Sequence, residues 1–203
     1  MSNFRRESGL ERGKTKRIVE VACLRRGDKK MIELRKITGD NIDEVIALKV
    51  EENQEDLIET TNLRSFADAH MLNADGIPAT PLAIYADEVA VGFLMYIYDT
   101  LDHESFENEV FYEKKSYFIW HIMIEKNYQG KGYGKLAFEK MLMDIQTTPD
   151  GDAEYVALFY RTSNVIAKTL YASFGFVDTG IIQDNSMLAI KNLYGKITQS
   201  LVE

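Results

Sequence analysis

The stretch YQGKGYGKLAFEKM, residues 128–141, places three glycines within five positions and then continues as a sequence with helical character. A glycine inside a helix costs about 1 kcal/mol relative to alanine, and a tight turn from a strand into a helix needs only one. Glycines also let the main chain approach a bound group closely, and the N–H groups at a helix N-terminus attract anions. The stretch therefore predicts a phosphate-binding turn.

Two common glycine-rich loops fit this stretch poorly. A nucleotide P-loop, G-x-x-x-x-G-K-[ST], would need glycine at Gln129 and serine or threonine at Leu136, so it is excluded. The dinucleotide pattern G-x-G-x-x-G/A is met by Gly132, Gly134 and Ala137. That motif follows the first strand of a long parallel sheet, whereas antiparallel-looking strands precede it here and too few residues follow for a second half.

A third pattern, Q-x-x-G-x-G, is satisfied by Gln129, Gly132 and Gly134 directly after an apolar strand. In this arrangement the glycines form a nest of backbone N–H groups, and the helix dipole favours the charge of a pyrophosphate. Lys131 and Lys135 add positive charge beside the nest. We therefore expect the loop to hold a pyrophosphate group.

Around this loop the apolar periodicity alternates between two and 3.6 residues, which predicts an α/β domain with short turns. The expected strands are residues 31–37, a hairpin over 81–98 that turns at Asp87 and Glu88 with Gly92 as a candidate bulge, and residues 116–125, 153–160, 177–183 and 186–193. The expected helices are residues 41–50, one or two short helices within 51–71, and residues 133–146 and 163–176.

Local signals refine these elements. Residues 116–125 are almost wholly apolar, which predicts a central strand that is buried on both faces. Asp40 or Asn41 can cap the first helix, and Ser163 or Asn164 can cap the last one.

Two motifs, in this order along the chain, resemble those of the GNAT acetyltransferase superfamily. Its acyl-CoA loop, [QR]-x-x-G-x-[GA], is matched at residues 129–134, and residues 164–176, NVIAKTLYASFGF, are similar to its second signature, N-x-x-A-x-x-L-Y-x-x-x-G-F. The resemblance covers about residues 31–191. It implies an α/β (α+β) GNAT fold, with a mixed central sheet of about six to seven strands and about four flanking helices. Residues 48–69 and 81–96 are also similar to bacterial spermine/spermidine acetyltransferases.

The resemblance implies acetyl-CoA as cosubstrate and assigns roles to particular residues. Tyr171 of the second signature would protonate the departing thiolate, and a backbone N–H near Met123 or Ile124 would hold the oxyanion. The residues expected at the cosubstrate are Met123, Ile124, Gln129, Gly130, Lys131, Gly132, Tyr133, Gly134, Lys135 and Asn164. The residues expected at the acceptor entrance are Glu51, Glu52, Glu55 and Asp56.

Several of these residues also have a purely structural interpretation. Tyr171 could be an ordinary core tyrosine, Asn164 a helix cap, and the acidic residues of 51–56 a solvated face. His121 lies in the apolar strand, where a hydrogen-bonded core histidine and a general base are both open. It is a candidate base because an alkyl amine, with a pKa of about 10.4, is neutral in only about one molecule in 10³ near pH 7 and needs a proton acceptor.

The cysteine and histidine content limits the chemistry. Cys23 is the single cysteine, and His70, His103 and His121 have no ligand spacing, so no metal is expected. No Ser–His pair is evident and Cys23 precedes the expected domain, so we expect direct transfer without an acetylated enzyme.

No part of the sequence approaches the roughly 18 uninterrupted apolar residues of a membrane span, and the first thirty residues lack a secretory signal. These features predict a cytoplasmic protein with no membrane partner.

Charge is distributed unevenly along the chain. Residues 1–30 hold ten Lys or Arg and four Asp or Glu, whereas residues 31–203 hold 14 and 28. A basic tail is typical of a nucleic-acid arm, but here acids are interspersed, aromatic residues are scarce and the acidic body would repel phosphate. We expect a solvated extension at 1–30, which need not belong to the functional protein, a domain at 31–203 and no nucleic-acid partner.

These features predict an N-acetyltransferase that moves acetyl directly from acetyl-CoA to a primary amine. The leading acceptor is a polyamine such as spermine or spermidine, because an acidic body attracts polycations. An aminoglycoside, a peptide or a protein N-terminus stays open as acceptor, and a non-catalytic acyl-CoA-binding regulator is the alternative from another class. Homodimers are common in the family that the chain resembles, so a homodimer is expected.

Overall fold

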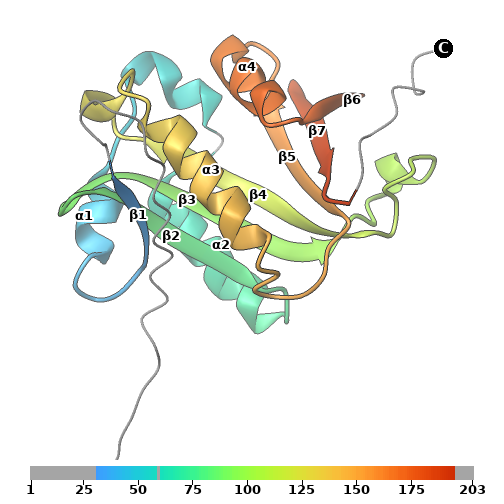
Figure 1. Ribbon diagram of the computed structural model, residues 1–203, viewed down its shortest axis with the longest axis horizontal. Helices are drawn as coiled ribbons and strands as arrows, with labels where there is room; N and C mark the ends of the chain where they lie inside the picture. Colours follow the sequence, from blue (N-terminus) through green and yellow to red (C-terminus); the bar gives the residue numbers. More distant parts are fainter. Residues whose placement is uncertain (1–30, 59, 195–203) are drawn as a thin grey trace, which may run out of the picture.

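The computed structural model describes residues 31–58 and 60–194, which form one seven-stranded sheet with helices on both faces (Figure 1). The strands are β1 Ile32–Lys36, β2 Ala79–Ala86, β3 Val89–Thr100, β4 Lys115–Ile124, β5 Tyr155–Arg161, β6 Val177–Gln183 and β7 Ser186–Asn192. The helices are α1 Ile42–Ala47, α2 Asn62–Ala74, α3 Tyr133–Ile145 and α4 Val165–Ser173, with 3-10 turns η1 Glu52–Leu57, η2 Glu104–Phe106 and η3 Lys126–Tyr128. The expected extension at 1–30, which contains Cys23, lies outside the described residues.

The sheet has the strand order β1-β2-β3-β4-β5-β7-β6. Neighbouring strands pair antiparallel, except for β4 and β5, which are parallel. This mixed sheet with its flanking helices confirms the expected fold class. The predicted hairpin is formed by β2 and β3, and Asp87 at its turn adopts a φ of 54°.

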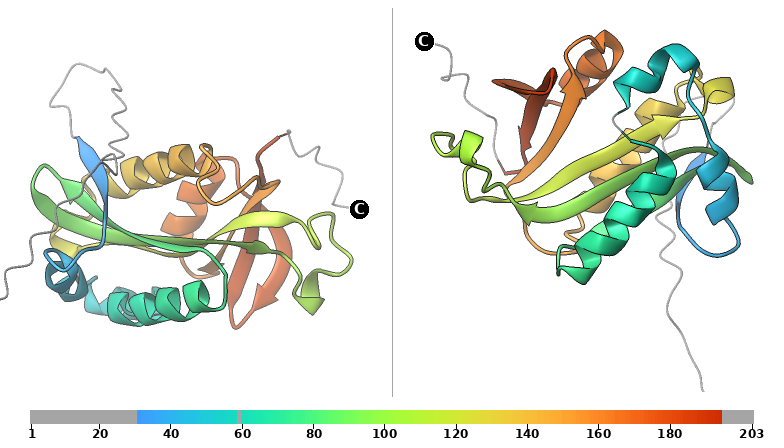
Figure 2. Two further views of the ribbon diagram at one scale, coloured as in Figure 1. Left: turned by 90° about the horizontal axis from the view of Figure 1, so that it is seen from below. Right: turned by 180° about the vertical axis from the view of Figure 1, so that it is seen from behind.

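Helices enclose the sheet from both sides, with α2 and α3 on opposite faces (Figure 2). On the face covered by α1 and α2, Val45 and Ala69 share a buried cluster with Phe93 of β3. On the other face α3 packs against α4, where the ring centroids of Phe138 and Tyr171 are 5.1 Å apart. The large apolar residues along one side of α3 are all buried: Phe138, Met141, Leu142 and Ile145.

The two parallel strands at the centre of the sheet separate along their length. β4 pairs with β5 only over residues 116–119 and 155–158. Beyond this point the two strands diverge toward the N-terminal ends of α3 and α4 (Figure 1). The sheet therefore opens at the C-terminal ends of β4 and β5, next to the glycine loop.

A β-bulge in β4 falls at the same place. Met95 of β3 pairs with His121, whereas the following residue of β3 pairs with Ile119, so Trp120 is the extra residue. Trp120 is 39% exposed. The expectation that this strand is buried on both faces is therefore wrong at Trp120, because the strand leaves its neighbour there.

The candidate bulge near Gly92 is also present, with Val91 as the extra residue opposite β2. A Cβ atom added at Gly92 would lie 2.4 Å from the carbonyl oxygen of Met123. The close approach of β3 to β4 therefore requires glycine at this position.

The first helix is shorter than predicted. α1 ends at Ala47, because Leu48 is already extended with a ψ of 136°. The carbonyl oxygen of Lys49 then accepts a hydrogen bond from the N–H of Lys126 at 2.9 Å. Asn41 is its N-cap residue, but the side chain accepts from the N–H of Thr38 at 2.8 Å instead of from the helix. The short helices expected within 51–71 are η1 and α2.

Candidate functional site

The glycine loop lies where β4 ends and α3 begins. Gly130 and Gly132 have φ angles of 70° and 86°, in the left-handed region that costs other residues about 1–2 kcal/mol. A Cβ atom at either position would meet no atom within 4 Å, so internal packing does not require glycine there. The requirement is conformational, and the open space in front of the loop lets a ligand approach the main chain.

The same loop carries features that attract an anion. Gly132 is the N-cap of α3, so the N–H groups of the first helical turn, which lack acceptors within a helix, follow directly after it. The Nζ of Lys131 donates to the carbonyl oxygen of Asn127 at 2.8 Å and lies 5.2 Å from the ring centroid of Tyr128. Its charge is thereby kept close to the loop. Together with the exposed Lys135, these groups fit a pyrophosphate.

The Gln129 side chain fixes the loop in place. Its Nε2 donates to the carbonyl oxygen of Ile124 at 2.9 Å and to Oε1 of Gln54 at 2.8 Å. A side-chain amide nitrogen has two hydrogens, so both are used within the protein. Gln129 therefore ties the loop to the end of β4 and to η1. Gln54 could not be selected from the sequence, because it belongs to no motif and lies 75 residues before Gln129.

The end of β4 directs one of the two predicted backbone donors toward the gap between β4 and β5. The N–H of Glu125 donates to the carbonyl oxygen of Val91 in β3 at 2.9 Å. Successive residues of a strand point their N–H groups to opposite sides. The N–H of Met123 therefore also points toward β3, where Met123 pairs with Phe93. The N–H of Ile124 points away from β3, which is the orientation that an oxyanion donor needs.

Tyr171 lies on α4, within the core that α3 covers. Its ring centroid is 5.1 Å from that of Phe138 and 5.9 Å from that of Tyr160, and the residue is 8% exposed. Burial raises the pKa of Tyr171 to about 12. The hydroxyl is therefore protonated at neutral pH and can donate a hydrogen bond or a proton.

Asn164 is the N-cap residue of α4. Its Oδ1 accepts a hydrogen bond from the N–H of Ala167 at 3.0 Å, which confirms the capping interpretation. The amide nitrogen of the same side chain takes no part in this cap, so a second contact with a cosubstrate is compatible with it.

His121 is a buried residue of β4, with 5% of its surface exposed. Its Nδ1 is 2.8 Å from Oγ of Ser65 on α2, and its ring packs edge-on against Phe93 at 5.2 Å. Within the described residues its Nε2 has no hydrogen-bond partner. Burial lowers the pKa of His121 to about 4, so the imidazole is neutral at pH 7.

The structure does not bring His121 and Tyr171 together. His121 contacts Phe93, a member of the cluster beneath α1 and α2, whereas Tyr171 belongs to the cluster beneath α3. The two candidate catalytic residues thus lie on opposite faces of the sheet.

A cavity of about 720 Å³ lies between η1 and the end of β5. Two of the carboxylates expected at the acceptor entrance, Glu55 and Asp56, line this cavity, whereas Glu51 and Glu52 are exposed outside it. The other lining residues are Ile58, Arg161, Thr162, Ser163 and Asn185.

The place of Arg161 in the lining of this cavity was not predicted from the sequence. Its Nη1 donates to the carbonyl oxygen of Asp184 in the β6–β7 turn, which holds the guanidinium at the β5 side of the cavity. The only available signal was a basic residue at the end of an apolar strand, directly before a helix cap.

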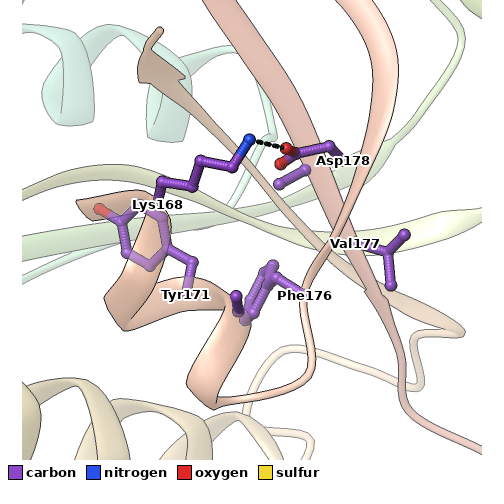
Figure 3. A pocket seen from close by; sticks show the side chains of 7 residues that line it. Lys168, Tyr171, Phe176, Val177 and Asp178 are labelled. Carbon is purple, nitrogen blue, oxygen red and sulfur yellow. Dashed lines mark ion pairs between the residues drawn. The ribbon is translucent and has the colours of Figure 1, made fainter. Parts of the chain in front are cut away.

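A smaller cavity of about 240 Å³ lies beside α4, between this helix and β6 and β7 (Figure 3). Nζ of Lys168 is 2.9 Å from Oδ2 of Asp178, and the Tyr160 hydroxyl donates to Oδ1 of the same carboxylate at 2.8 Å. The Tyr171 hydroxyl points away from Asp178 in Figure 3. Lys168, Tyr171 and Asp178 line this cavity. The other lining residues are Ala172, Phe176, Val177 and Ala189.

Within residues 31–58 and 60–194, no group of three or more His, Cys, Asp or Glu side chains is placed to hold a metal ion. The same residues include no helix with both the length and the apolar character that crossing a bilayer requires.

Residues 42–176, more than half of the chain, match the model of the acetyltransferase (GNAT) family. The chain therefore belongs to the GNAT family. It is an acetyl-CoA-dependent N-acetyltransferase, which confirms the family and the cosubstrate that its two motifs predicted.

Among its relatives, the chain is 27% identical to a probable spermine N(1)-acetyltransferase of Bacillus subtilis subsp. natto (strain BEST195), over 76% of this chain and 93% of the relative. It is 26% identical to the spermine/spermidine N(1)-acetyltransferase of Bacillus subtilis (strain 168), with the same coverage. Its fold is similar to that of Arabidopsis thaliana Naa50 in complex with the bisubstrate analogue CoA-Ac-MVNAL, with a TM-score of 0.52 and 18% identity over 79% of this chain and 98% of that one.

Proposed function

We propose that this acetyltransferase acetylates a primary amine of a polyamine such as spermine or spermidine. The observation that carries the proposal is the pair Glu55 and Asp56, which lines the larger cavity. The surrounding domain holds 28 acidic and 14 basic residues over 31–203, so its field concentrates polycations near the surface. The two carboxylates can hold distal ammonium groups while a terminal amine reacts. The names of the two Bacillus relatives support the same class of acceptor.

The glycine loop, Ile124 and Tyr171 each have a part in the proposed reaction. Acetyl-CoA supplies the acetyl group as an activated thioester. The glycine loop would hold the pyrophosphate, and the N–H of Ile124 would stabilise negative charge on the acetyl oxygen. The amine nitrogen forms a bond to the acetyl carbon as the carbon–sulfur bond breaks. Tyr171 would donate a proton to the departing sulfur, and the amine loses one.

The amine must be neutral before it attacks. With a pKa of about 10.4, bringing it to the neutral form near pH 7 costs about 4–5 kcal/mol. His121 is poorly suited as the acceptor of this proton, because its pKa is about 4 and α2 covers it. We propose that His121 stabilises the fold, and that the proton leaves through water in the cavity beside Glu55 and Asp56.

Steady-state kinetics with a panel of amines tests the acceptor. Spermine, spermidine, putrescine, an aminoglycoside, a peptide with a free N-terminus and a long monoamine would each be offered with acetyl-CoA. We expect the highest kcat/KM for spermine and spermidine, and we expect the advantage to shrink as ionic strength rises, because salt screens exposed charges. Equal use of the monoamine at low salt would contradict the polyamine assignment and leave only the acetyltransferase.

A pair of double variants tests the two cavity carboxylates. Glu55→Gln with Asp56→Asn removes both charges from the cavity, whereas Glu51→Gln with Glu52→Gln removes the same charge from the exposed positions outside it. Two partly exposed ion pairs contribute together about 1–2 kcal/mol, so the first variant should lose about 5- to 30-fold in kcat/KM for spermine at low salt. The second should lose less than about threefold. Equal losses would show that only the general field attracts the acceptor.

The assembly and location expected from the sequence stay predictions. Size-exclusion chromatography with light scattering would measure whether the protein is a homodimer, and fractionation of cells would test the cytoplasmic location.

A further inference from the structure

The segment between Lys49 and Asn62 carries the acidic residues of the proposed amine site. Three contacts join this segment and its two flanking residues to the end of β4 and the glycine loop. The N–H of Lys126 donates to the carbonyl oxygen of Lys49 at 2.9 Å, just before the segment. Nδ2 of Asn62, just after it, lies 3.9 Å from Sδ of Met123. Between these two anchors, the hydrogen bond from Nε2 of Gln129 to Oε1 of Gln54, at 2.8 Å, joins a side chain of η1 to the glycine loop.

The middle of this segment has little other support. η1 contains no buried residue, and its acidic members, including Glu52 and Glu55, are exposed. Segments with few buried contacts change their position at low energetic cost. Ile58, directly after η1, packs against the cluster beneath α1 and α2, and the Gln54 contact supports the segment on the side of the glycine loop.

Gln54 also shapes η1 itself. Its Oε1 accepts from the N–H of Glu51 at 3.4 Å, as part of the capping box of η1, as well as from Nε2 of Gln129 at 2.8 Å. One oxygen is thus shared between the start of η1 and the glycine loop. Gln129 is oriented in turn by the carbonyl oxygen of Ile124, the residue with the candidate oxyanion N–H. Gln54 therefore links the glycine loop directly to the start of η1.

We propose that Gln54 is a positioning residue that couples the two substrate sites, so that occupation of the glycine loop by the cosubstrate tightens the binding of the amine. The proposal rests on the proposed function, because it takes the loop as the CoA site and the cavity as the amine site. Coupling of this kind is reciprocal, so the amine tightens the binding of CoA by the same factor.

Calorimetry with CoA and spermine measures the coupling without turnover, because CoA carries no acetyl group. We expect saturating CoA to lower the Kd of spermine about fivefold, the factor that corresponds to one neutral hydrogen bond of about 1 kcal/mol. Gln54→Met keeps the length of the side chain but removes the acceptor oxygen. This variant should bind CoA alone within about twofold of the wild type, while its coupling factor falls to about one.

Two further variants separate coupling from general damage to the segment. Asn53→Ala alters the exposed neighbour of Gln54 in η1 and should keep the full coupling factor. Gln54→Glu keeps an acceptor oxygen for Gln129 and should restore most of the coupling that Gln54→Met loses. In steady-state assays, Gln54→Met should raise KM for the amine about fivefold, with a smaller change in kcat. The loss of one hydrogen bond of about 1 kcal/mol should lower the melting temperature by no more than about 2–4 °C.

The outcomes distinguish this inference from the proposed function. If the wild type acetylates spermine but shows no coupling, or if Gln54→Met couples as the wild type does, Gln54 is not the coupling residue. If the wild type binds CoA but does not acetylate spermine, the polyamine assignment fails. The coupling is then measured with the amine of the panel that is acetylated, and the same two results decide it.

Discussion

The buried histidine of β4 should make the stability of the protein depend on pH in a predictable direction. Burial lowers the pKa of His121 from its ordinary value of 6.5 to about 4. The unfolded chain therefore binds a proton at a higher pH than the folded protein does. The stabilisation that comes from keeping the imidazole neutral is complete above pH 6.5 and is lost as the pH falls toward about 4.

The size of the effect follows from this shift. At pH 5 the unfolded histidine is almost wholly protonated, whereas the folded one is still mostly neutral. The pH is then about 1.5 units below the unfolded pKa, and each unit corresponds to about 1.4 kcal/mol. His121 alone should therefore reduce the free energy of unfolding by about 2 kcal/mol between pH 8 and pH 5.

Urea denaturation of the wild type and of His121→Gln at pH 8 and pH 5 measures this contribution. The variant should lose about 2 kcal/mol less than the wild type over that interval, whatever its stability at pH 8. His70→Gln, on the exposed side of α2, should lose as much as the wild type does. Equal losses in His121→Gln and the wild type, or an NMR titration of His121 near pH 6.5, would refute the reasoning and return His121 to the candidates for the base.

Three further variants probe the loop, the acid and the cap. Gly132→Val forces a branched residue into a φ of 86° and obstructs the loop. Calorimetry on the folded variant should therefore show a Kd for acetyl-CoA at least about tenfold higher than that of the wild type. An unchanged Kd would contradict the assignment of the loop to acetyl-CoA. Tyr171→Phe keeps the packing against Phe138 but removes the candidate acid, so kcat should fall about 10²-fold with little change in the Kd of the cosubstrate. Activity within about twofold of the wild type would remove Tyr171 from the mechanism. Asn164→Ala removes the cap of α4 and should destabilise the protein by about 1 kcal/mol in urea denaturation, whereas Asn164→Ser should restore most of it.

Elements with strong local signals could be predicted almost to the residue. The strands expected at 177–183 and 186–193 are β6 and β7, because two polar residues that tolerate positive φ, Asp184 and Asn185, separate two apolar runs. The glycine loop was equally clear, since its spacing and its place before a helix are local properties of the sequence.

Features that depend on contacts between distant residues could not be predicted. After the early end of α1 at Ala47, the carbonyl oxygen of Lys49 accepts a hydrogen bond from the N–H of Lys126, which no local pattern encodes. Gln54 and Arg161 gain their roles only because the fold brings η1 beside the glycine loop and beside the end of β5. Their residue types are common on protein surfaces, so no sequence pattern distinguishes these two residues from other polar ones.

The position of His121 shows how one inserted residue can change the face of the sheet to which side chains of a strand point. Side chains in a strand alternate with a period of two, so Ile119, His121 and Met123 would share one face of a regular strand. In the structure Ile119 packs in the cluster beneath α3, whereas Met123 packs in the cluster beneath α1 and α2. The bulge at Trp120 inserts one residue and moves everything after it to the opposite face.

The same bulge determines how the two substrates would meet. It lies one residue beyond the last pair of β4 and β5, so the strand changes face where the sheet opens. Tyr171 belongs to the cluster beneath α3, whereas Ile58, which lines the larger cavity, packs against the cluster beneath α1 and α2. The candidate acid thus packs on one face of the sheet, whereas the proposed amine cavity is bordered by Ile58 toward the other face and by Arg161 and Ser163 at the end of β5. We expect the amine to reach the thioester through the gap between β4 and β5, so that it attacks from one side while Tyr171 protonates sulfur from the other.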